Sequence, residues 1–389
     1  MKRNVLLLTA TQALFQTTSI MVMTLSGLVG LMLAPDRSLA TLPIALMVVA
    51  TATCLIPASL LMQRYGRRTG FLVGTALGAL AGFLGAYAIT RGDFVLFVVA
   101  NMLVGAYQAF AQFYRFAAAD VANDAFRSRA ISWVIAGGVV AAVLGPALVR
   151  YTQNLGTLPF AAPYIAMGLL ALLAAALLTA LRMPPPTSEQ TQGPARPLLV
   201  IMRQPAFLTA LTASAIGSAV MILVMTATPL AMQLCGLPVS DTATVIQWHV
   251  LGMFVPSFFT GHLIARFGVL PVMAAGVLLL GSHILVAASG VERLHFLSGL
   301  TLLGVGWNFL FVSGTTLLTT TYLPAEKAKV QALHDFLVFG AVSIASFSAG
   351  ALLDAAGWDL VNIAAAPLLA LMLGVMAIFA LRLAAQPIN

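Results

Sequence analysis

The sequence is poor in charge. Only 8% of its 389 residues are Asp, Glu, Lys or Arg, whereas 61% are hydrophobic. Because soluble domains carry about 25% charged residues, this chain cannot cover itself with a hydrated surface and needs lipid as its solvent. A membrane-spanning helix takes about 20 apolar residues, so the chain accommodates roughly twelve spans with short connections.

Cysteine is nearly absent as well. The two cysteines, Cys54 and Cys235, cannot form a disulfide scaffold, and the chain has no Cys-x-x-Cys pair and no His-rich tail. It also lacks a glycine-rich phosphate-binding loop with Lys followed by Ser or Thr, so ATP is not its direct energy source. No catalytic constellation is present. We therefore expect neither an enzyme, nor a pumping ATPase, nor a soluble metal chaperone.

Acidic residues are few, 11 against 19 basic ones, and the net charge is +8. The basic residues are scattered in short loops, which indicates topology signals rather than nucleic-acid binding. If the N-terminus is cytoplasmic, 15 of the 19 lie on the cytoplasmic side. They are Lys2, Arg3, Arg64, Arg67, Arg68, Arg115, Arg127, Arg129, Arg182, Arg196, Arg203, Arg266, Lys327, Lys329 and Arg382. This asymmetry predicts that both termini are cytoplasmic.

Continuous apolar runs predict an all-α polytopic membrane protein with twelve transmembrane helices. The spans are expected at 4–33, 40–62, 70–90, 94–117, 130–149, 160–181, 206–234, 243–265, 270–289, 295–321, 331–353 and 360–382. The first run is too long for a signal-peptide core and no cleavage pattern follows it, so we count it as a span. The polar central loop at 182–205 separates an N-terminal six-helix bundle, 1–181, from a C-terminal one, 206–389.

The two halves also contain a similar short sequence at equivalent positions. Gln63-Arg64-Tyr65-Gly66 follows the second span, and Ala265-Arg266-Phe267-Gly268 follows the eighth, 202 positions later. A repeat at equivalent places implies two related bundles, with a site between them near the midplane of the membrane.

The loop after the second span carries a recognisable motif. Ser59-x-x-x-Gln63-Arg64-Tyr65-Gly66-Arg67-Arg68 resembles the Gly-x-x-x-Asp-Arg-x-Gly-Arg-Arg motif of the major facilitator superfamily, and Gly145-Pro146 resembles its Gly-Pro signature. The resemblance implies that fold and a carrier that works as a monomer. Gln63 replaces the motif's carboxylate, which weakens the expectation of its charge relay. Arg64, Arg67 and Arg68 then hold either helix carbonyls or anionic lipid, or only mark the cytoplasmic side.

Two further motifs place soft metal ligands inside apolar helices. Met221 and Met225 form Met-x-x-x-Met, and 28 positions after Met221, His249 and Met253 form His-x-x-x-Met. The i, i+4 spacing puts both members of each pair on one helix face. Thioethers and imidazoles suit copper, and thioethers favour Cu(I). Matched depth on neighbouring spans predicts a ladder of ligands for a carried copper ion.

Packing is the alternative explanation of these motifs. In a chain with 17 Met residues, Met-x-x-x-Met arises by chance roughly once, because Met is a common core filler. Met372 and Met376 repeat the spacing in the last span, and we interpret that pair as packing. His249 follows Gln247 and Trp248, so a hydrogen-bonded structural histidine stays open.

The four ligands resemble those of the CcoA-like copper importers, a branch of the superfamily in proteobacteria. The resemblance implies copper import across the bacterial inner membrane by alternating access, supplying assembly of cbb3-type cytochrome oxidase. It implies a cytoplasmic copper chaperone as partner, and Cys54 and Cys235 as accessory ligands or redox groups. Copper, with Cu(I) as the expected form, is then the cargo. We expect no organic cofactor and no nucleic acid as partner, whereas membrane lipid is an expected partner.

Other polar residues inside spans are candidates for a gate or cavity. His334-Asp335 relays protons or closes an inner gate; alternatively, as we prefer, it caps its helix and pairs with Lys327 or Lys329. Asn101, Gln108, Gln112 and Arg115 share one face of the fourth span, which we expect to line the central cavity. Trp307, Asn308 and Asn362 are weaker candidates of the same kind.

Two alternative functions remain open. A carrier of an organic solute, such as riboflavin or a drug, has the same architecture. The copper branch has riboflavin-carrying relatives, although we do not expect those to keep both metal motifs. A membrane sensor that binds copper without moving it is the other alternative. Cellular accumulation of copper separates the three functions.

Overall fold

The chain is helical over the residues that the computed structural model describes, which are 2–36, 39, 42–153, 155, 160–183 and 194–384. Among these residues, twelve helical stretches are long and apolar enough to cross a membrane. This confirms the predicted all-α polytopic fold. Part of the predicted central loop, residues 184–193, lies outside the described part of the chain.

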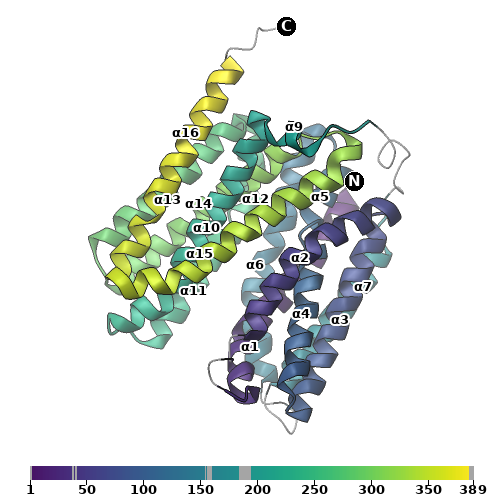
Figure 1. Cartoon of the computed structure of the whole chain (residues 1–389), viewed down its shortest axis with the longest axis vertical. Coiled ribbons are helices and arrows are strands. Elements are labelled where there is room, and N and C mark those ends of the chain that lie inside the picture. The colour runs from purple at the N-terminus through teal and green to yellow at the C-terminus, as the bar shows by residue number, and fades with distance from the viewer. Residues whose placement is uncertain are drawn as a thin grey trace. The chain divides into compact units, whose positions relative to one another are not determined.

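The chain forms two compact units (Figure 1), and the first contains most of the N-terminal half. Unit 1 comprises Met1–Val121, Gly137–Pro194 and Pro324–Phe336. Its elements are α1 (Lys2–Leu33), α2 (Leu42–Tyr65), α3 (Arg67–Arg91), α4 (Phe94–Ala111), α5 (Tyr114–Val121), most of α6 (Arg127–Thr152), α7 (Ala161–Thr179), η3 (Pro324–Glu326) and the start of α15 (Lys327–Ile363). Helix α3 packs against both α4 and α7, and α2 packs against α4.

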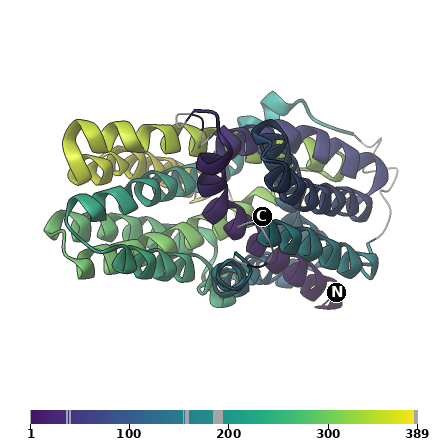
Figure 2. The ribbon, with the colours of Figure 1, turned by 90° about the horizontal axis from the view of Figure 1, so that it is seen from below.

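Unit 2 comprises Ala122–Ala136, Ala195–Leu323 and Leu337–Asn389. Its elements are η2 (Asp124–Phe126), the start of α6, α9 (Leu198–Met202), α10 (Pro205–Leu234), α11 (Val239–Phe254), α12 (Ser257–Phe267), α13 (Val269–Ser289), α14 (Arg293–Leu318), the rest of α15 and α16 (Ala365–Ala384). Helix α14 is the centre of this unit and packs against α10, α11 and α13. Figure 2 shows these green to yellow helices running alongside one another.

The units do not follow the sequence halves everywhere. Residues 122–136 belong to unit 2, and residues 324–336 belong to unit 1. The two units therefore do not test the predicted division of the chain by the loop at 182–205 into two six-helix bundles, and that division stays a prediction.

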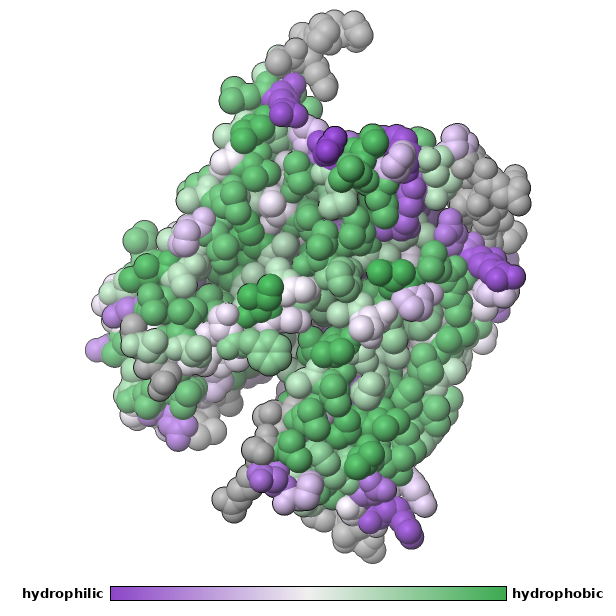
Figure 3. Space-filling view, viewed as in Figure 1, coloured by the Kyte–Doolittle hydropathy of each residue, from purple (hydrophilic) through white to green (hydrophobic). Residues whose placement is uncertain are grey.

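The outward faces of the helices are apolar. Large side chains such as Leu278, Leu285 and Phe347 are at least 69% exposed. Figure 3 shows hydrophobic side chains over the lengths of the helices, while hydrophilic ones gather near the helix ends. Lipid satisfies such a surface because the helices already pair their own backbone groups.

The internal repeat seen in the sequence is also a repeat in the structure. Gly66 joins α2 to α3 with φ of 88°, and Gly268 joins α12 to α13 with the same φ. Residues with a side chain rarely adopt this left-handed backbone conformation, which explains glycine at both places. The preceding arginine lies over the neighbouring ring in each copy, with Arg64 5.3 Å from the Tyr65 ring centre and Arg266 5.2 Å from that of Phe267.

Candidate functional site

The eighth span is broken near its middle. Helix α11 ends at Phe254 and α12 begins at Ser257, because Pro256 has no backbone N–H to donate to the preceding turn. Asn308 of α14 bridges the break: its Nδ2 donates to the Met253 carbonyl at 2.7 Å and to Ser257 Oγ at 2.5 Å, and its Oδ1 accepts from Thr260 Oγ1 at 2.7 Å. In membrane proteins, interrupted helices held by neighbouring polar groups commonly line a cavity.

An aromatic cluster adjoins this break and consists of Phe254, Trp307 and Phe311. The rings of Trp307 and Phe311 are stacked, with centres 4.8 Å apart and planes 15° from parallel. Phe254 meets Trp307 edge to face at 6.2 Å. The indole N–H of Trp307 donates to Ser218 Oγ of α10 at 3.1 Å, which fixes the ring between helices. Trp307 is buried, whereas Phe311 is half-buried.

The predicted sulfur ligands lie around the same cluster. Met221 is one helical turn after Ser218, and Met253 immediately precedes Phe254. Both methionines are buried, whereas Met225 is half-buried. The structure thus brings the two motifs to one part of unit 2, and their convergence on a single ion stays a prediction.

The fourth predicted ligand, His249, faces α14. Its Nδ1 lies 2.8 Å from the Leu300 carbonyl, and the side chain is fully buried. Its Nε2 has no hydrogen-bond partner among the described residues. A donating Nδ1 leaves a lone pair on Nε2, which is the tautomer that a metal ligand uses. The imidazole therefore suits either a structural hydrogen bond alone or a metal ion.

Other metal ligands are sparse. In the part of the chain that the structure describes, no group of three or more His, Cys, Asp or Glu side chains could hold a metal ion. A copper site would therefore depend on thioethers. Cys54 is free and half-buried in α2, and Cys235 is free and exposed at the end of α10.

Unit 1 contains a buried charged cluster at Arg115, His334 and Asp335. The Asp335 Oδ1 atom lies 2.6 Å from Arg115 Nη2 and 2.8 Å from His334 Nδ1. Arg115 also donates to Gln112 Oε1 at 2.7 Å. All three members of the cluster are buried, and Asp335 Oδ2 has no hydrogen-bond partner within the described residues. The preferred interpretation, in which His334-Asp335 caps its helix and pairs with Lys327 or Lys329, is wrong for the cap and for Lys327, because Asp335 lies inside α15 and Lys327 pairs with Asp120.

Lys327 pairs elsewhere because a carboxylate of α5 reaches it. Asp120 Oδ2 lies 2.9 Å from Lys327 Nζ and 3.2 Å from Arg67 Nε. Arg67 also donates to Gln331 Oε1 at 2.6 Å, and Ser59 Oγ donates to the Ala328 carbonyl at 2.7 Å. Asp120 thus supplies a carboxylate to the loop motif, although Gln63 stands where that motif has one.

The other motif residues have smaller roles. Arg68 donates to the Thr179 carbonyl at 2.7 Å, which joins α3 to the end of α7. Arg64 lies over Tyr65, as described above, and Gly66 turns the chain. Arg68 thus contacts a helix carbonyl, as one of the predicted alternatives has it, and the role of the three arginines stays a prediction.

The predicted polar face of the fourth span is divided. Asn101 is fully buried and accepts from Ser26 Oγ at 2.7 Å, and that hydroxyl also bonds Tyr164 at 2.9 Å. Asn101 therefore belongs to the core of unit 1. Gln108 and Gln112 are half-buried. Helix α4 ends at Ala111 and α5 begins at Tyr114, so the predicted polar face is not continuous.

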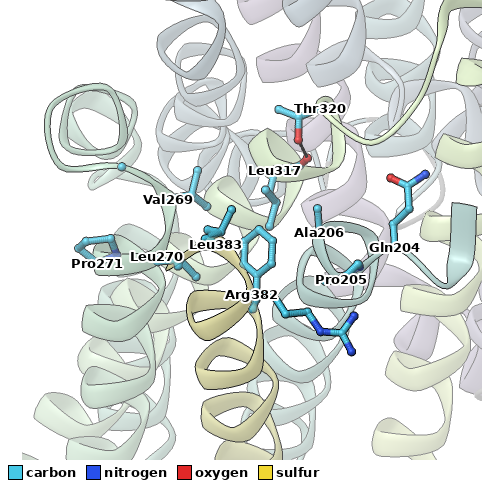
Figure 4. Close-up of a pocket in the computed structure, with 12 residues that line it drawn as sticks. Gln204, Pro205, Ala206, Val269, Leu270, Pro271, Leu317, Thr320, Arg382 and Leu383 are labelled. Carbon is cyan, nitrogen blue, oxygen red and sulfur yellow. Dashed lines mark hydrogen bonds between the residues drawn. The ribbon is translucent and has the colours of Figure 1, made fainter. Parts of the chain in front are cut away.

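A cavity of about 920 Å³ lies at one end of unit 2. It is lined mainly by apolar groups of α10, α13, α14 and α16, with Gln204, Thr320 and Arg382 as its polar members. In Figure 4 the guanidinium of Arg382 projects away from Leu383 and Val269. None of the site residues predicted from the sequence lines this cavity.

Comparison with known proteins identifies the family. The sequence model of the Major Facilitator Superfamily matches residues 6–247, more than half of the chain. The chain belongs to this superfamily. The fold agrees: the outward conformation of the superfamily transporter FucP aligns with a TM-score of 0.79 at 18% identity, covering 98% of this chain and 99% of that one.

Two superfamily relatives match most of the chain. The riboflavin transporter RfnT of Brucella anthropi is 41% identical over 379 residues, which cover 96% of this chain and 94% of the relative. The uncharacterized superfamily transporter YdeG of Bacillus subtilis is 30% identical over 334 residues, covering 81% and 77%. The superfamily resemblance is thus confirmed. The assignment to its copper-importing branch is not supported, because the relative that matches nearly the whole chain is named for riboflavin.

Sequence reasoning missed several residues of this superfamily member. Phe311 is four positions from Trp307, a spacing that places both on one helix face. Pro256 inside an apolar run was the signal for the helix break. No local sequence signal pointed to Asp120, because it lies far along the chain from Gln63 and its partner Lys327 is farther still.

Proposed function

We propose that the protein is a secondary transporter that carries riboflavin, or a closely related flavin, across the bacterial inner membrane. The observation that carries this proposal is 41% identity to RfnT over 96% of the chain. Function depends on the residues of the site rather than on the fold. Identity at this level over nearly the whole chain favours many site residues in common and therefore a shared solute class. The broken span beside the aromatic cluster supports an organic solute with a flat ring.

Copper import is a second candidate, and one observation favours it. The Nε2 atom of His249 has no hydrogen-bond partner among the described residues, on a helix that also carries Met253. A cuprous ion accepts such nitrogen and thioether ligands. Import of copper with Met221, Met225, His249 and Met253 as ligands remains the alternative proposal, together with a cytoplasmic copper acceptor.

Paired uptake measurements test both candidates. The protein is expressed in a bacterium that cannot synthesise riboflavin and has no other riboflavin carrier, and uptake of radiolabelled riboflavin and of radiolabelled copper is followed in parallel. We expect saturable riboflavin uptake above the empty-vector level, and copper uptake no higher than the empty-vector level. Copper accumulation without riboflavin uptake, abolished in His249→Ala, would reverse the order of the two candidates.

A further inference from the structure

The aromatic cluster occupies a particular side of α14. Leu310 packs against Gly217 of α10, and Gly304 packs against the backbone of α11. Successive residues of a helix are 100° apart, so Trp307 and Phe311 project between these two contact directions. The pair therefore lies on the side of α14 between α10 and α11, the helices that carry the Met-x-x-x-Met and His-x-x-x-Met motifs.

The cluster is held in a fixed geometry. The hydrogen bond from Trp307 to Ser218 orients the indole, and the edge of Phe254 supports it from α11. Phe311 stacks on the indole and is only half-buried. A preorganised stack with a partly accessible ring suits a third flat aromatic system, because offset stacking is favourable and no side chain must first be ordered.

The surrounding methionines fit the same ligand. Ser218 and Phe254 both contact Trp307. Met221 lies one helical turn after Ser218, and Met253 directly precedes Phe254. Met225 is half-buried one turn beyond Met221. Thioethers are flexible, polarizable and make favourable contacts with aromatic ring edges. The sulfur motifs thus suit an apolar ring as well as they suit a metal ion.

We propose that Phe254, Trp307 and Phe311 form the surface on which the planar ring system of the transported solute stacks, with Phe311 as the contacting ring. This inference rests on the proposed function, since the isoalloxazine ring of a flavin is such a solute. The methionines of α10 and α11 border the ring and adapt to its edges. Stacking of a planar base on an aromatic side chain is tolerant of substituents, so related flavins share the surface.

The test replaces the aromatic ring of Phe311 by an apolar side chain of roughly similar volume. Phe311→Leu removes the aromatic face, Phe311→Tyr retains it, and Phe309→Leu is the matched control on the same helix, because Phe309 packs toward Gly276 of α13. Riboflavin is titrated into each purified full-length variant, and quenching of flavin fluorescence gives Kd. We expect Phe311→Leu to raise Kd about 10-fold, while Phe311→Tyr and Phe309→Leu stay within about 2-fold of the wild-type protein.

The outcomes separate the two proposals. If the wild-type protein binds and takes up riboflavin but Phe311→Leu binds it equally well, the stacking surface is overturned and the proposed function stands. If Phe309→Leu weakens binding as much as Phe311→Leu, the loss is structural and the stacking surface is again overturned. If the wild-type protein neither binds nor takes up riboflavin, both proposals fail.

Discussion

At the scale of single residues, buried charge is the strongest constraint in unit 1. Arg115 and Asp335 are both at least 94% buried along their side chains and only 2.6 Å apart. A charge removed from water at such depth is expensive unless it is paired, so each residue depends on the other. His334 completes the cluster by sharing the Asp335 Oδ1 atom. Asp335 of α15 therefore has Arg115 of α5 as its partner, and a gating role for this cluster stays a prediction.

We expect Asp335→Ala to destabilise the protein by about 3 kcal/mol, because it leaves the Arg115 guanidinium buried without its carboxylate. The measurement is the thermal unfolding midpoint of purified protein in detergent. Asp124→Ala is the control, since Asp124 pairs with Arg127 but is 91% exposed. Equal midpoints for the two variants would contradict the assigned role of the buried pair.

At the scale of helices, close contact between α11 and α14 positions both His249 and the helix break. A Cβ atom at Gly304 would lie 2.5 Å from the His249 carbonyl, and one at Gly252 would lie 2.8 Å from the Thr301 carbonyl. Small residues at such crossings let two helix backbones approach within a membrane. The approach also lets His249 reach the Leu300 carbonyl and lets Asn308 reach the carbonyl of Met253.

Gly304→Ala should therefore destabilise unit 2 by about 2 kcal/mol, because the added methyl group meets backbone atoms that cannot move aside. Gly281→Ala is the matched control in α13, where an added Cβ has no neighbour within 4 Å. Yield of monodisperse protein and the unfolding midpoint report the difference. A Gly304→Ala protein as stable as Gly281→Ala would show that the helices can separate without cost.

At the scale of the whole molecule, the distribution of basic residues predicts the orientation of the chain in the membrane. Of the 19 Lys and Arg residues, 15 belong to the predicted cytoplasmic set. Lys and Arg residues in short loops resist translocation, so this distribution favours one orientation of all twelve spans. We propose that both termini are cytoplasmic, a property that the family membership by itself leaves open.

Reporter fusions test this orientation. A fluorescent protein that matures only in the cytoplasm, fused after Arg382, should be bright, and alkaline phosphatase fused at the same place should be inactive. Phosphatase fused after Gly92, in the loop between α3 and α4, should be active as the control. The reverse pattern of activities would invert the proposed topology.

The sequence by itself determined the properties that depend on composition and local pattern: twelve apolar spans, the loop motif, the glycine turns of the repeat, and the excess of basic residues. Each of these follows from nearby residues or from transfer of side chains into lipid. Only the tertiary structure decided which polar groups meet, because Asp335 lies 220 positions from Arg115 and Asn308 lies 55 positions from Met253. The methionine spacing could not identify a cargo, since the same i, i+4 pattern serves metal binding, core packing and the border of an aromatic stack. Those uses differ only in what the neighbouring helices place against the sulfur atoms.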